Sequence, residues 1–380
     1  MMSQVIISTV GTSLLTNQIN RSVSSEETWY NQLRDTANLR REQVPQETLD
    51  IIETLKERAK QKLANSNIAQ IRSASAELNG IYGLYEDQLN QGKQDVHYLI
   101  ATDTVQGKET ATIVQEFLQG QQLVAEMYTP PGLSTDSTAS FSGGIDELLS
   151  WLQETIVGFK SKSYRVCFNL VGSFKSLQGY LNTIGMFYAD EIIYIFEGKH
   201  SEVIRIPRLP VKVDESVIQP YAVEFALMAA NTGINKQHLS GVPETLICAV
   251  DDTHMMLSTW GSLVWNQVKD SLLSTDLLSF PFLKYEPSFL KDYQSTKDRK
   301  ERVKLQETLA KISGLLRQDQ GNGAALKADG GIQLETYRNT QVDHFRVTLS
   351  QRVSCQFKQG VLSLRYYGGH DHVERSEGIS

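Results

Sequence analysis

Two segments of the chain share one pattern, in which a run of apolar residues leads into a turn of small residues. Near the amino end, Val5–Val10 has the composition of a buried strand and is followed directly by Gly11-Thr12-Ser13. The second copy is stronger, because the apolar run 164–168 leads into Asn169–Lys175, after which residues 176–186 have helical spacing. Two such loops in one parallel sheet meet at its carboxyl edge. The pattern therefore predicts an α/β fold with a ligand site at that edge.

The ligand expected at this edge is an anion. Backbone N–H groups and the helix dipole favour negative charge where a strand feeds a small-residue turn and the start of a helix. Gly172 permits close approach, and Lys175 supplies a mobile positive charge. A third strand, 96–100, ends at Ala101-Thr102-Asp103-Thr104. We therefore predict phosphate binding rather than three simple connecting turns.

The fingerprints of the common nucleotide folds are absent. Neither G-x-G-x-x-G nor G-x-x-x-x-G-K-[ST] occurs in the chain, so a nicotinamide cofactor or a nucleoside triphosphate is not the first expectation.

Strands and helices alternate through the first half of the chain. Strand-like runs recur at 96–100, 123–128, 164–168 and 191–196, and 48–60 has the spacing of a helix. This alternation predicts a doubly wound, Rossmann-like parallel sheet. Residues 132–144 are rich in Ser, Thr and Gly and are expected to form a loop near the same edge, as a lid over the ligand.

Composition limits the class of protein. With 380 residues, of which 40% are hydrophobic and 21% charged, the chain can form several domains with real cores. It has no apolar stretch of membrane-spanning length and no signal peptide, so we expect a cytoplasmic protein without membrane contact. Cys167, Cys248 and Cys355 lie far apart in apolar surroundings, which favours buried thiols over disulfides or a zinc site.

The pattern changes twice after the predicted sheet, which divides the chain into three expected domains. Residues 1–206 form the doubly wound domain, and 207–280 form a small, mainly helical connector of the winged helix-turn-helix kind. Residues 281–380 have an amphipathic helical pair interrupted at 295–298, followed by strand-like runs at 333–338, 344–350, 353–357 and 360–367. Two helices followed by an antiparallel sheet predict a small α+β fold.

Charge separates the two ends of the chain. Residues 284–380 hold 16 Lys plus Arg against 12 Asp plus Glu, a balance of +4, whereas the remainder holds 21 against 32, a balance of −11. The basic end is therefore the better candidate for contact with RNA.

The first half resembles the CRISPR-associated Rossmann fold (CARF) sensors. The resemblance rests on Ser8–Leu15, Ala101–Thr104, Asn169–Lys175 and Ala189–Tyr194, although family members often carry a second Gly where Ser173 stands here. It implies a sensor for a cyclic oligoadenylate, cyclic tetra-adenylate before cyclic hexa-adenylate, as an allosteric ligand rather than a cofactor. The implied binding residues are Val10, Gly11, Thr12, Ser13, Thr102, Asp103, Thr104, Gly172, Ser173, Phe174 and Lys175.

The last hundred residues resemble the RelE superfamily of toxin endoribonucleases. The matching segments are Phe289–Tyr293, Ala325–Lys327, Leu334–Arg338, His344–Val347 and Leu364–His372. A sensor joined to such a domain is similar to the CRISPR-associated mRNA interferases. This resemblance implies a type III CRISPR ancillary effector, switched on by a cyclic oligoadenylate, that cuts mRNA in the ribosomal A site.

The residues of this end also suit metal-free RNA cleavage. That chemistry needs a base for the ribose 2′-OH, cations for the phosphorane and an acid for the departing 5′-oxygen. The candidates are Arg338, Arg346, His370 and His372, with Tyr367 stacking on a base because strand alternation places Tyr366 with the apolar residues. Lys327, Arg352 and Arg365 are expected to contact the RNA. No bound metal and no cofactor are expected.

Symmetry favours a homodimer. A cyclic tetra- or hexanucleotide has a two-fold axis, so two copies of the Gly11 and Gly172 loops can close on one ring. Ligand binding would then bias two arrangements of the C-terminal domains.

Other interpretations remain open. Arg365 and His370 have the R-x4-H spacing of HEPN ribonucleases acting on free RNA, although Gly368-Gly369 suits a helix poorly. A ligand-controlled transcriptional regulator without enzymatic activity is a second alternative. The sensor could also cleave its own ligand, with Thr12, Ser13, Ser173 and Lys175 positioning a 2′-OH, and His370-x-His372 could resemble half a metal site.

Overall fold

The computed structural model describes residues 2–20, 22–196, 202–338 and 340–379. The chain forms two compact units, residues 1–211 and 212–380, which we describe one at a time. Within the described ranges, every helix is too short or too polar to cross a lipid bilayer.

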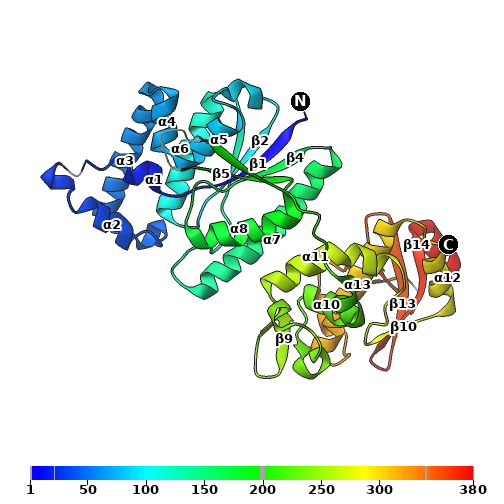
Figure 1. Cartoon of the computed structure of the whole chain (residues 1–380). Helices are drawn as coiled ribbons and strands as arrows, with labels where there is room; N and C mark the ends of the chain where they lie inside the picture. Colours follow the sequence, from blue (N-terminus) through cyan, green and yellow to red (C-terminus); the bar gives the residue numbers. More distant parts are fainter. Residues whose placement is uncertain (1, 21, 197–201, 339, 380) are drawn as a thin grey trace. The chain divides into compact units, whose positions relative to one another are not determined.

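Unit 1 is built on a six-stranded sheet (Figure 1). Its strands are β1 (Gln4–Thr9), β2 (Val96–Ile100), β3 (Val124–Tyr128), β4 (Arg165–Asn169), β5 (Glu191–Ile195) and β6 (Val203–Pro207). The spatial order is β3-β2-β1-β4-β5-β6, in which the first five strands are parallel and β6 runs antiparallel to β5. The predicted parallel sheet is therefore confirmed, and it is compatible with a Rossmann-like fold.

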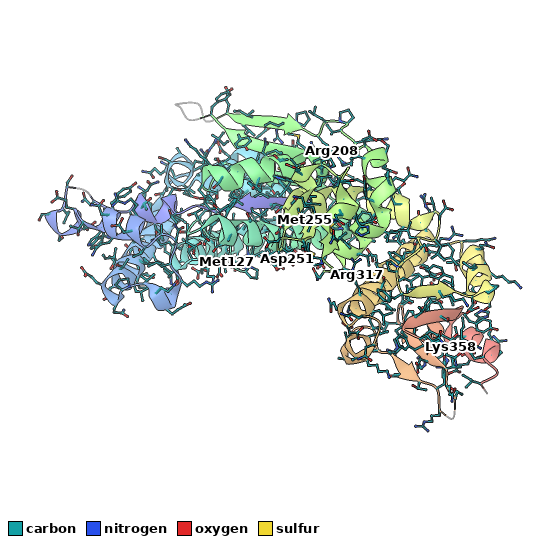
Figure 2. All side chains as sticks on the ribbon, turned by 90° about the horizontal axis from the view of Figure 1, so that it is seen from below. Met127, Arg208, Asp251, Met255, Arg317 and Lys358 are labelled. Carbon is teal, nitrogen blue, oxygen red and sulfur yellow. The ribbon has the colours of Figure 1, made fainter. Side chains whose placement is uncertain are left out.

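Helices cover both faces of this sheet. They are α1 (Ser13–Thr16), α2 (Trp29–Asp35), α3 (Gln46–Asn65), α4 (Ile68–Ala74), α5 (Ala76–Leu84), α6 (Val105–Gly120), α7 (Thr138–Ser161) and α8 (Lys175–Tyr188). Alternate residues of β1 point to opposite faces, yet Val5, Ile6 and Ile7 are all fully buried. The apolar run at the amino end thus reflects a strand in the middle of two helical layers. Met127, labelled in Figure 2, lies on the edge strand β3 and is partly exposed.

One predicted loop is wrong in part. Residues 132–144 were expected to be irregular, but α7 begins at Thr138, so only 132–137 fit that expectation. The Ser137 hydroxyl accepts a hydrogen bond from the Ser140 amide (3.1 Å) and caps the helix. Ser and Thr therefore mark a helix start here as well as a loop.

Unit 2 begins with helices around a small antiparallel sheet. The elements are α9 (Glu215–Ile218), α10 (Ala222–Ala229), β7 (Ile234–Asn235), β8 (Ile247–Ala249), β9 (His254–Leu257) and α11 (Thr259–Ser274). β9 lies between β7 and β8 in a three-stranded sheet. Helices around one hairpin were expected here, and the winged helix-turn-helix assignment stays a prediction.

The remainder of unit 2 carries a five-stranded sheet. Its elements are β10 (Leu283–Tyr285), α12 (Pro287–Ser295), α13 (Arg299–Gln318), α14 (Ala324–Ala328), β11 (Glu335–Thr336), β12 (Asp343–Arg346), β13 (Gln351–Lys358), β14 (Val361–Gly369) and α15 (His370–Ser376). The order is β10-β14-β13-β12-β11, with β10 parallel to β14 and the other pairs antiparallel. The interrupted helical pair is confirmed, because α12 ends at Ser295 and Asp298 caps α13 by accepting from the Lys300 amide (2.7 Å).

One apolar core runs through unit 2, from Ile218 near its start to Tyr367 near its end. Gln306, fully buried on α13, ties the two parts together: its side-chain oxygen accepts from the Leu278 amide, and its amide donates to the carbonyls of Leu273 and Asp276 (each 2.8 Å). The domain boundary expected at residue 280 stays a prediction, and the packing across it is continuous.

The cysteines only partly follow expectation. Cys167 and Cys355 are buried, but Cys248 is exposed, because it lies on β8 at the edge of the small sheet.

We predict that Gln306→Leu destabilises both parts of unit 2 together. Leucine keeps the size but leaves the Leu278 amide and the two carbonyls without a partner, at about 1–3 kcal/mol for each buried group left unsatisfied. Hydrogen exchange should therefore accelerate in α11 and in β13 and β14 alike. Faster exchange confined to α11 would contradict a shared core, and Gln359→Leu at an exposed turn provides the matched control.

Candidate functional site

A pocket of about 470 Å³ lies at the carboxyl edge of the unit 1 sheet, where β1, β2 and β4 end. Because these strands are parallel neighbours, their following loops meet there. Eight of the eleven residues expected at a ligand site line it: Val10, Gly11, Thr12, Ser13, Thr102, Gly172, Ser173 and Phe174.

The other three expected residues lie elsewhere. Asp103 forms ion pairs with Arg40 (2.7 Å) and Lys108 (2.6 Å). Thr104 is buried and caps α6 by accepting from the Gly107 amide (3.1 Å). Lys175 is exposed in the first turn of α8, outside the lining of this pocket. These three side chains therefore do not contribute to the pocket in the structure.

Sequence reasoning missed one wall of this pocket. It is made by α2 and the residues after it, namely Tyr30, Leu33, Arg34, Ala37 and Asn38. Asn38 accepts a hydrogen bond from the Thr135 hydroxyl (2.5 Å), so this wall is tied to the loop before α7. No motif marks these residues, because they come from a helical segment inserted between β1 and β2.

Two hydroxyl groups in the pocket have no partner. The Oγ atoms of Ser13 and Ser173 are buried and make no hydrogen bond within the described part of the chain. Ser173 adopts φ +105°, a conformation that favours glycine and costs a serine energy. A strained residue with an unsatisfied hydroxyl group is a typical feature of a binding loop, because a ligand can accept the missing hydrogen bond.

Glu77 contacts both the Gly11 loop and the Gly172 loop. Its Oε1 accepts from the Gly11 amide (2.7 Å), its Oε2 accepts from the Ser75 hydroxyl (2.7 Å), and a Cβ atom added to Gly172 would overlap its carboxylate. Gly172 therefore leaves room for the Glu77 side chain, and the Gly11 amide donates to Glu77, while phosphate binding by these two loops stays a prediction. Burial raises the pKa of the fully buried Glu77 carboxyl.

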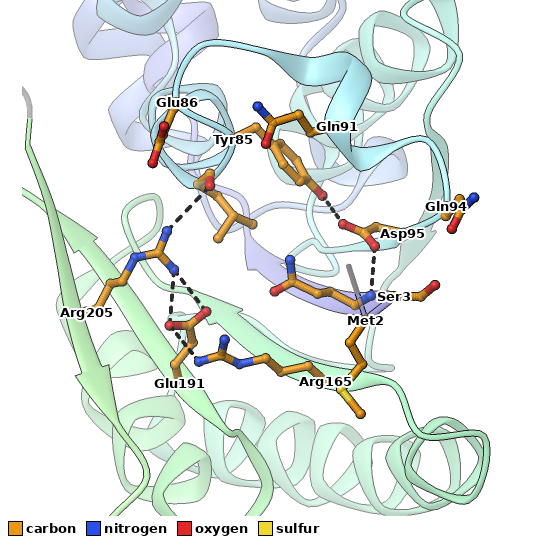
Figure 3. Close-up of a pocket in the computed structure, with 12 residues that line it drawn as sticks. Met2, Ser3, Tyr85, Glu86, Gln91, Gln94, Asp95, Arg165, Glu191 and Arg205 are labelled. Carbon is orange, nitrogen blue, oxygen red and sulfur yellow. Dashed lines mark hydrogen bonds and ion pairs between the residues drawn. The ribbon is translucent and has the colours of Figure 1, made fainter.

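A larger cavity, of about 770 Å³, lies at the opposite, amino edge of the sheet (Figure 3). Its charges are largely paired within the protein: Glu191 binds Arg165 (3.2 Å) and Arg205 (3.0 Å), and Asp95 accepts from the Tyr85 hydroxyl (2.8 Å). No residue expected at a ligand site lines this cavity. We therefore take the smaller pocket, with its unsatisfied hydroxyl groups, as the candidate ligand site.

Unit 2 presents a polar face on its five-stranded sheet. Register pairs His344 with Ser354 and Arg346 with Arg352, so these four side chains lie on one face. Neither arginine forms an ion pair with a carboxylate among the described residues. Two like charges placed opposite each other on neighbouring strands destabilise a sheet, and an anion between them would remove the repulsion.

His344 is held firmly on this face. Its ring stacks on Tyr337 (centroids 4.1 Å apart), and its Nε2 lies 3.1 Å from Nη1 of Arg352. Burial and the Arg352 charge lower the pKa of His344, which keeps the imidazole neutral near pH 7 and able to accept a proton. His344 was not among the predicted catalytic residues, because a histidine within a strand-like run is more simply interpreted as a buried residue of the sheet.

The predicted catalytic residues lie at different places in unit 2. Arg346 lies on the polar face and His370 lies at the start of α15, where its Nδ1 is 3.0 Å from Glu374. His372 instead contacts Asp292 on α12 (3.2 Å). Arg338 is exposed just beyond β11. Of the residues expected to bind RNA, Arg352 lies on the polar face, Arg365 on β14 binds Glu377 (2.8 Å), and Lys327 is exposed on α14.

The expected position of Tyr367 is wrong. It is buried, with 3% of its surface exposed, whereas Tyr366 is half-buried. The register shifts between Ser354 and Cys355, where Leu364 pairs with Cys355 and Tyr366 with Ser354, so Arg365 is an extra residue. Such a bulge reverses the alternation beyond it and turns Tyr367 into the core.

Within the described residues, no group of three or more His, Cys, Asp or Glu side chains is placed to hold a metal ion.

Residues 72–209 match the model of a family described as CRISPR-associated protein (Cas_APE2256). Over this segment of unit 1 the chain is therefore similar to a CRISPR-associated family. The matched segment includes Thr102 and the Gly172 loop of the pocket, and also Glu77 next to them, and it ends before unit 2.

We predict that Glu77→Gln changes how the stability of unit 1 depends on pH. Because folding raises the pKa of Glu77, the folded chain binds a proton more tightly, and its stability falls as pH rises from the ordinary value of 4.5 to the raised one. Glutamine keeps an oxygen for the Gly11 amide and does not titrate. Urea midpoints measured from about pH 5 to about pH 8 should fall less for the variant.

A wild-type slope retained by Glu77→Gln would contradict this account. Glu77→Ala is the matched control, since it leaves the Gly11 amide unsatisfied and should cost about 1–3 kcal/mol at either pH.

Proposed function

We propose that this chain is a type III CRISPR ancillary effector with a cyclic oligoadenylate sensor and a ribonuclease. Cyclic tetra-adenylate binds at the carboxyl edge of the unit 1 sheet and activates a metal-independent, RelE-like endoribonuclease in unit 2, in a homodimer. The nuclease cuts mRNA in the ribosomal A site and so halts translation.

The sensor half of the proposal is supported by the family match over a segment that contains the Gly172 loop. The pocket there offers the unsatisfied hydroxyl groups of Ser13 and Ser173 to phosphate oxygens. The insertion with Tyr30 and Asn38 adds an aromatic ring and an amide, the side-chain types that stack on and hydrogen-bond to adenine.

The observation that carries the nuclease half is the pair of opposed arginines, Arg346 and Arg352. Guanidinium groups bind phosphate through two parallel N–H···O bonds, and a pre-positioned pair stabilises the extra charge of a phosphorane. His344 is neutral and its Nε2 accepts a hydrogen bond from Arg352, so it positions that guanidinium opposite Arg346. The paired helices α12 and α13 before an antiparallel sheet also agree with the small α+β fold on which this half of the proposal rests.

The alternatives receive less support. Arg365 lies on a strand and His370 opens a short helix, which counts against a helical HEPN site. A transcriptional regulator would leave the like-charge pair on the sheet without a role.

We predict that Arg346→Ala lowers ribosome-dependent cleavage by about 10²-fold or more, because one transition-state cation is lost. The assay compares RNA cutting with and without cyclic tetra-adenylate, on naked RNA and on ribosomes with an open A site. Binding of the cyclic ligand should be unchanged. Lys358→Ala, an exposed cation near the other end of the same sheet and labelled in Figure 2, is the control.

The same assay separates the alternatives. Equal cutting of naked RNA would favour a HEPN-like nuclease, and no cutting by the wild type under either condition would favour a regulator. Loss of ligand binding in Arg346→Ala would contradict separate sensor and nuclease sites.

We predict that Ser13→Ala and Ser173→Ala each weaken the binding of cyclic tetra-adenylate. A hydrogen bond to a charged group is worth about 1.5–3 kcal/mol, so each change should raise Kd by roughly tenfold or more. Fluorescence anisotropy with a labelled ligand measures this, and Ser150→Ala on the exposed surface of α7 is the control. An unchanged Kd in both variants would place the ligand elsewhere.

A further inference from the structure

The last turn of the chain places a carboxylate on the polar face of the unit 2 sheet. Helix α15 packs on β13 and β14, and Glu377 follows its last residue. Although it lies near the chain end, the Glu377 side chain is only 1% exposed. A buried carboxylate needs hydrogen-bond donors around it.

Three donors hold this carboxylate. Arg365 donates from Nε to Oε1 (2.8 Å) and from Nη2 to Oε2 (2.9 Å), which makes a two-pronged pair. The Ser354 hydroxyl donates to Oε1 (2.6 Å). An arginine fork with a hydroxyl group is the donor set that also fits two oxygens of a phosphodiester.

This donor set belongs to the same face as the proposed nuclease residues. Ser354 is the register partner of His344, next to the pair formed by Arg346 and Arg352. The Glu377 carboxylate is thus bound at Ser354, on the strand that also carries Arg352.

We propose that Arg365 and Ser354 form a binding site for a phosphate of the RNA backbone, and that Glu377 occupies this site when RNA is absent. The inference rests on the proposed ribonuclease function and names the contact through which its substrate is held. RNA and the end of the chain then compete for one set of donors.

The local structure allows this exchange at low cost. Val373 is fully buried and anchors α15, but Glu377 lies beyond the helix and is followed by Gly378 at φ +70°. Only the last turn has to fray, and helix ends fray readily. Arg365 keeps an anionic partner throughout, which avoids the penalty of a half-buried charge left alone.

The test uses the full-length chain with Glu377→Gln and a short, uncleavable 2′-O-methyl RNA in fluorescence anisotropy. The variant should bind the RNA about tenfold more tightly than the wild type, because the competing anion is gone. Asp371→Asn is the control, since it removes the same charge from the exposed side of α15 and leaves Arg365 paired. Adding Arg365→Gln to Glu377→Gln should abolish the gain.

A second measurement needs no variant. Binding of the RNA to the wild type should accelerate hydrogen exchange in the last turn, residues 374–379. Equal RNA affinities of Glu377→Gln and Asp371→Asn, or unchanged hydrogen exchange in the last turn, would overturn the proposal. Glu377 would then serve only to hold α15 against the sheet.

These outcomes are distinct from a failure of the proposed function. Tighter RNA binding by Glu377→Gln without any cleavage by the wild type would support the phosphate site and reject the nuclease. Ribosome-dependent cleavage with no change in RNA affinity would do the reverse.

Discussion

The parallel pairing of β1 with β2 on one side and β4 on the other is the constraint on which unit 1 depends. It brings together three loops that are about 70 to 160 residues apart in the chain, as expected at the carboxyl edge of a doubly wound sheet. Glu77 then fixes the two glycine loops against each other, because its carboxylate accepts the Gly11 amide and fills the space left by the missing side chain of Gly172. A buried acid outside the lining of the pocket therefore fixes the two loops that carry Ser13 and Ser173.

The two candidate sites contain different kinds of unsatisfied groups. The pocket of unit 1 contains two neutral hydroxyl groups without a partner among the described residues, and one of them belongs to the strained Ser173. The polar face of unit 2 uses opposed cations, and the repulsion between Arg346 and Arg352 is tolerated without a carboxylate between them among the described residues. Both arrangements cost stability in the absence of a ligand, which is the usual mark of a functional site rather than of a fold-determining core.

Much of the fold could be predicted because it depends on local patterns. The apolar run 96–100 gave β2 without error, and the break at 295–298 marked the change from α12 to α13, where Asp298 caps the second helix. Glu77 and the α2 wall could not be found, since their roles arise only when segments distant in sequence meet. Tyr367 was misplaced because one bulge at Arg365 reverses strand alternation, and a bulge leaves no trace in the period of the sequence.

The three cysteines differ in exposure, which allows a dye to be attached selectively to one of them. Cys167 and Cys355 are buried, and burial raises the pKa of both thiols, so they react slowly with alkylating reagents. Cys248 is exposed on β8, within the part of unit 2 that precedes its five-stranded sheet. A maleimide dye will therefore attach at one place on the native chain, and its emission can report on unit 2 while a nucleotide is added to unit 1.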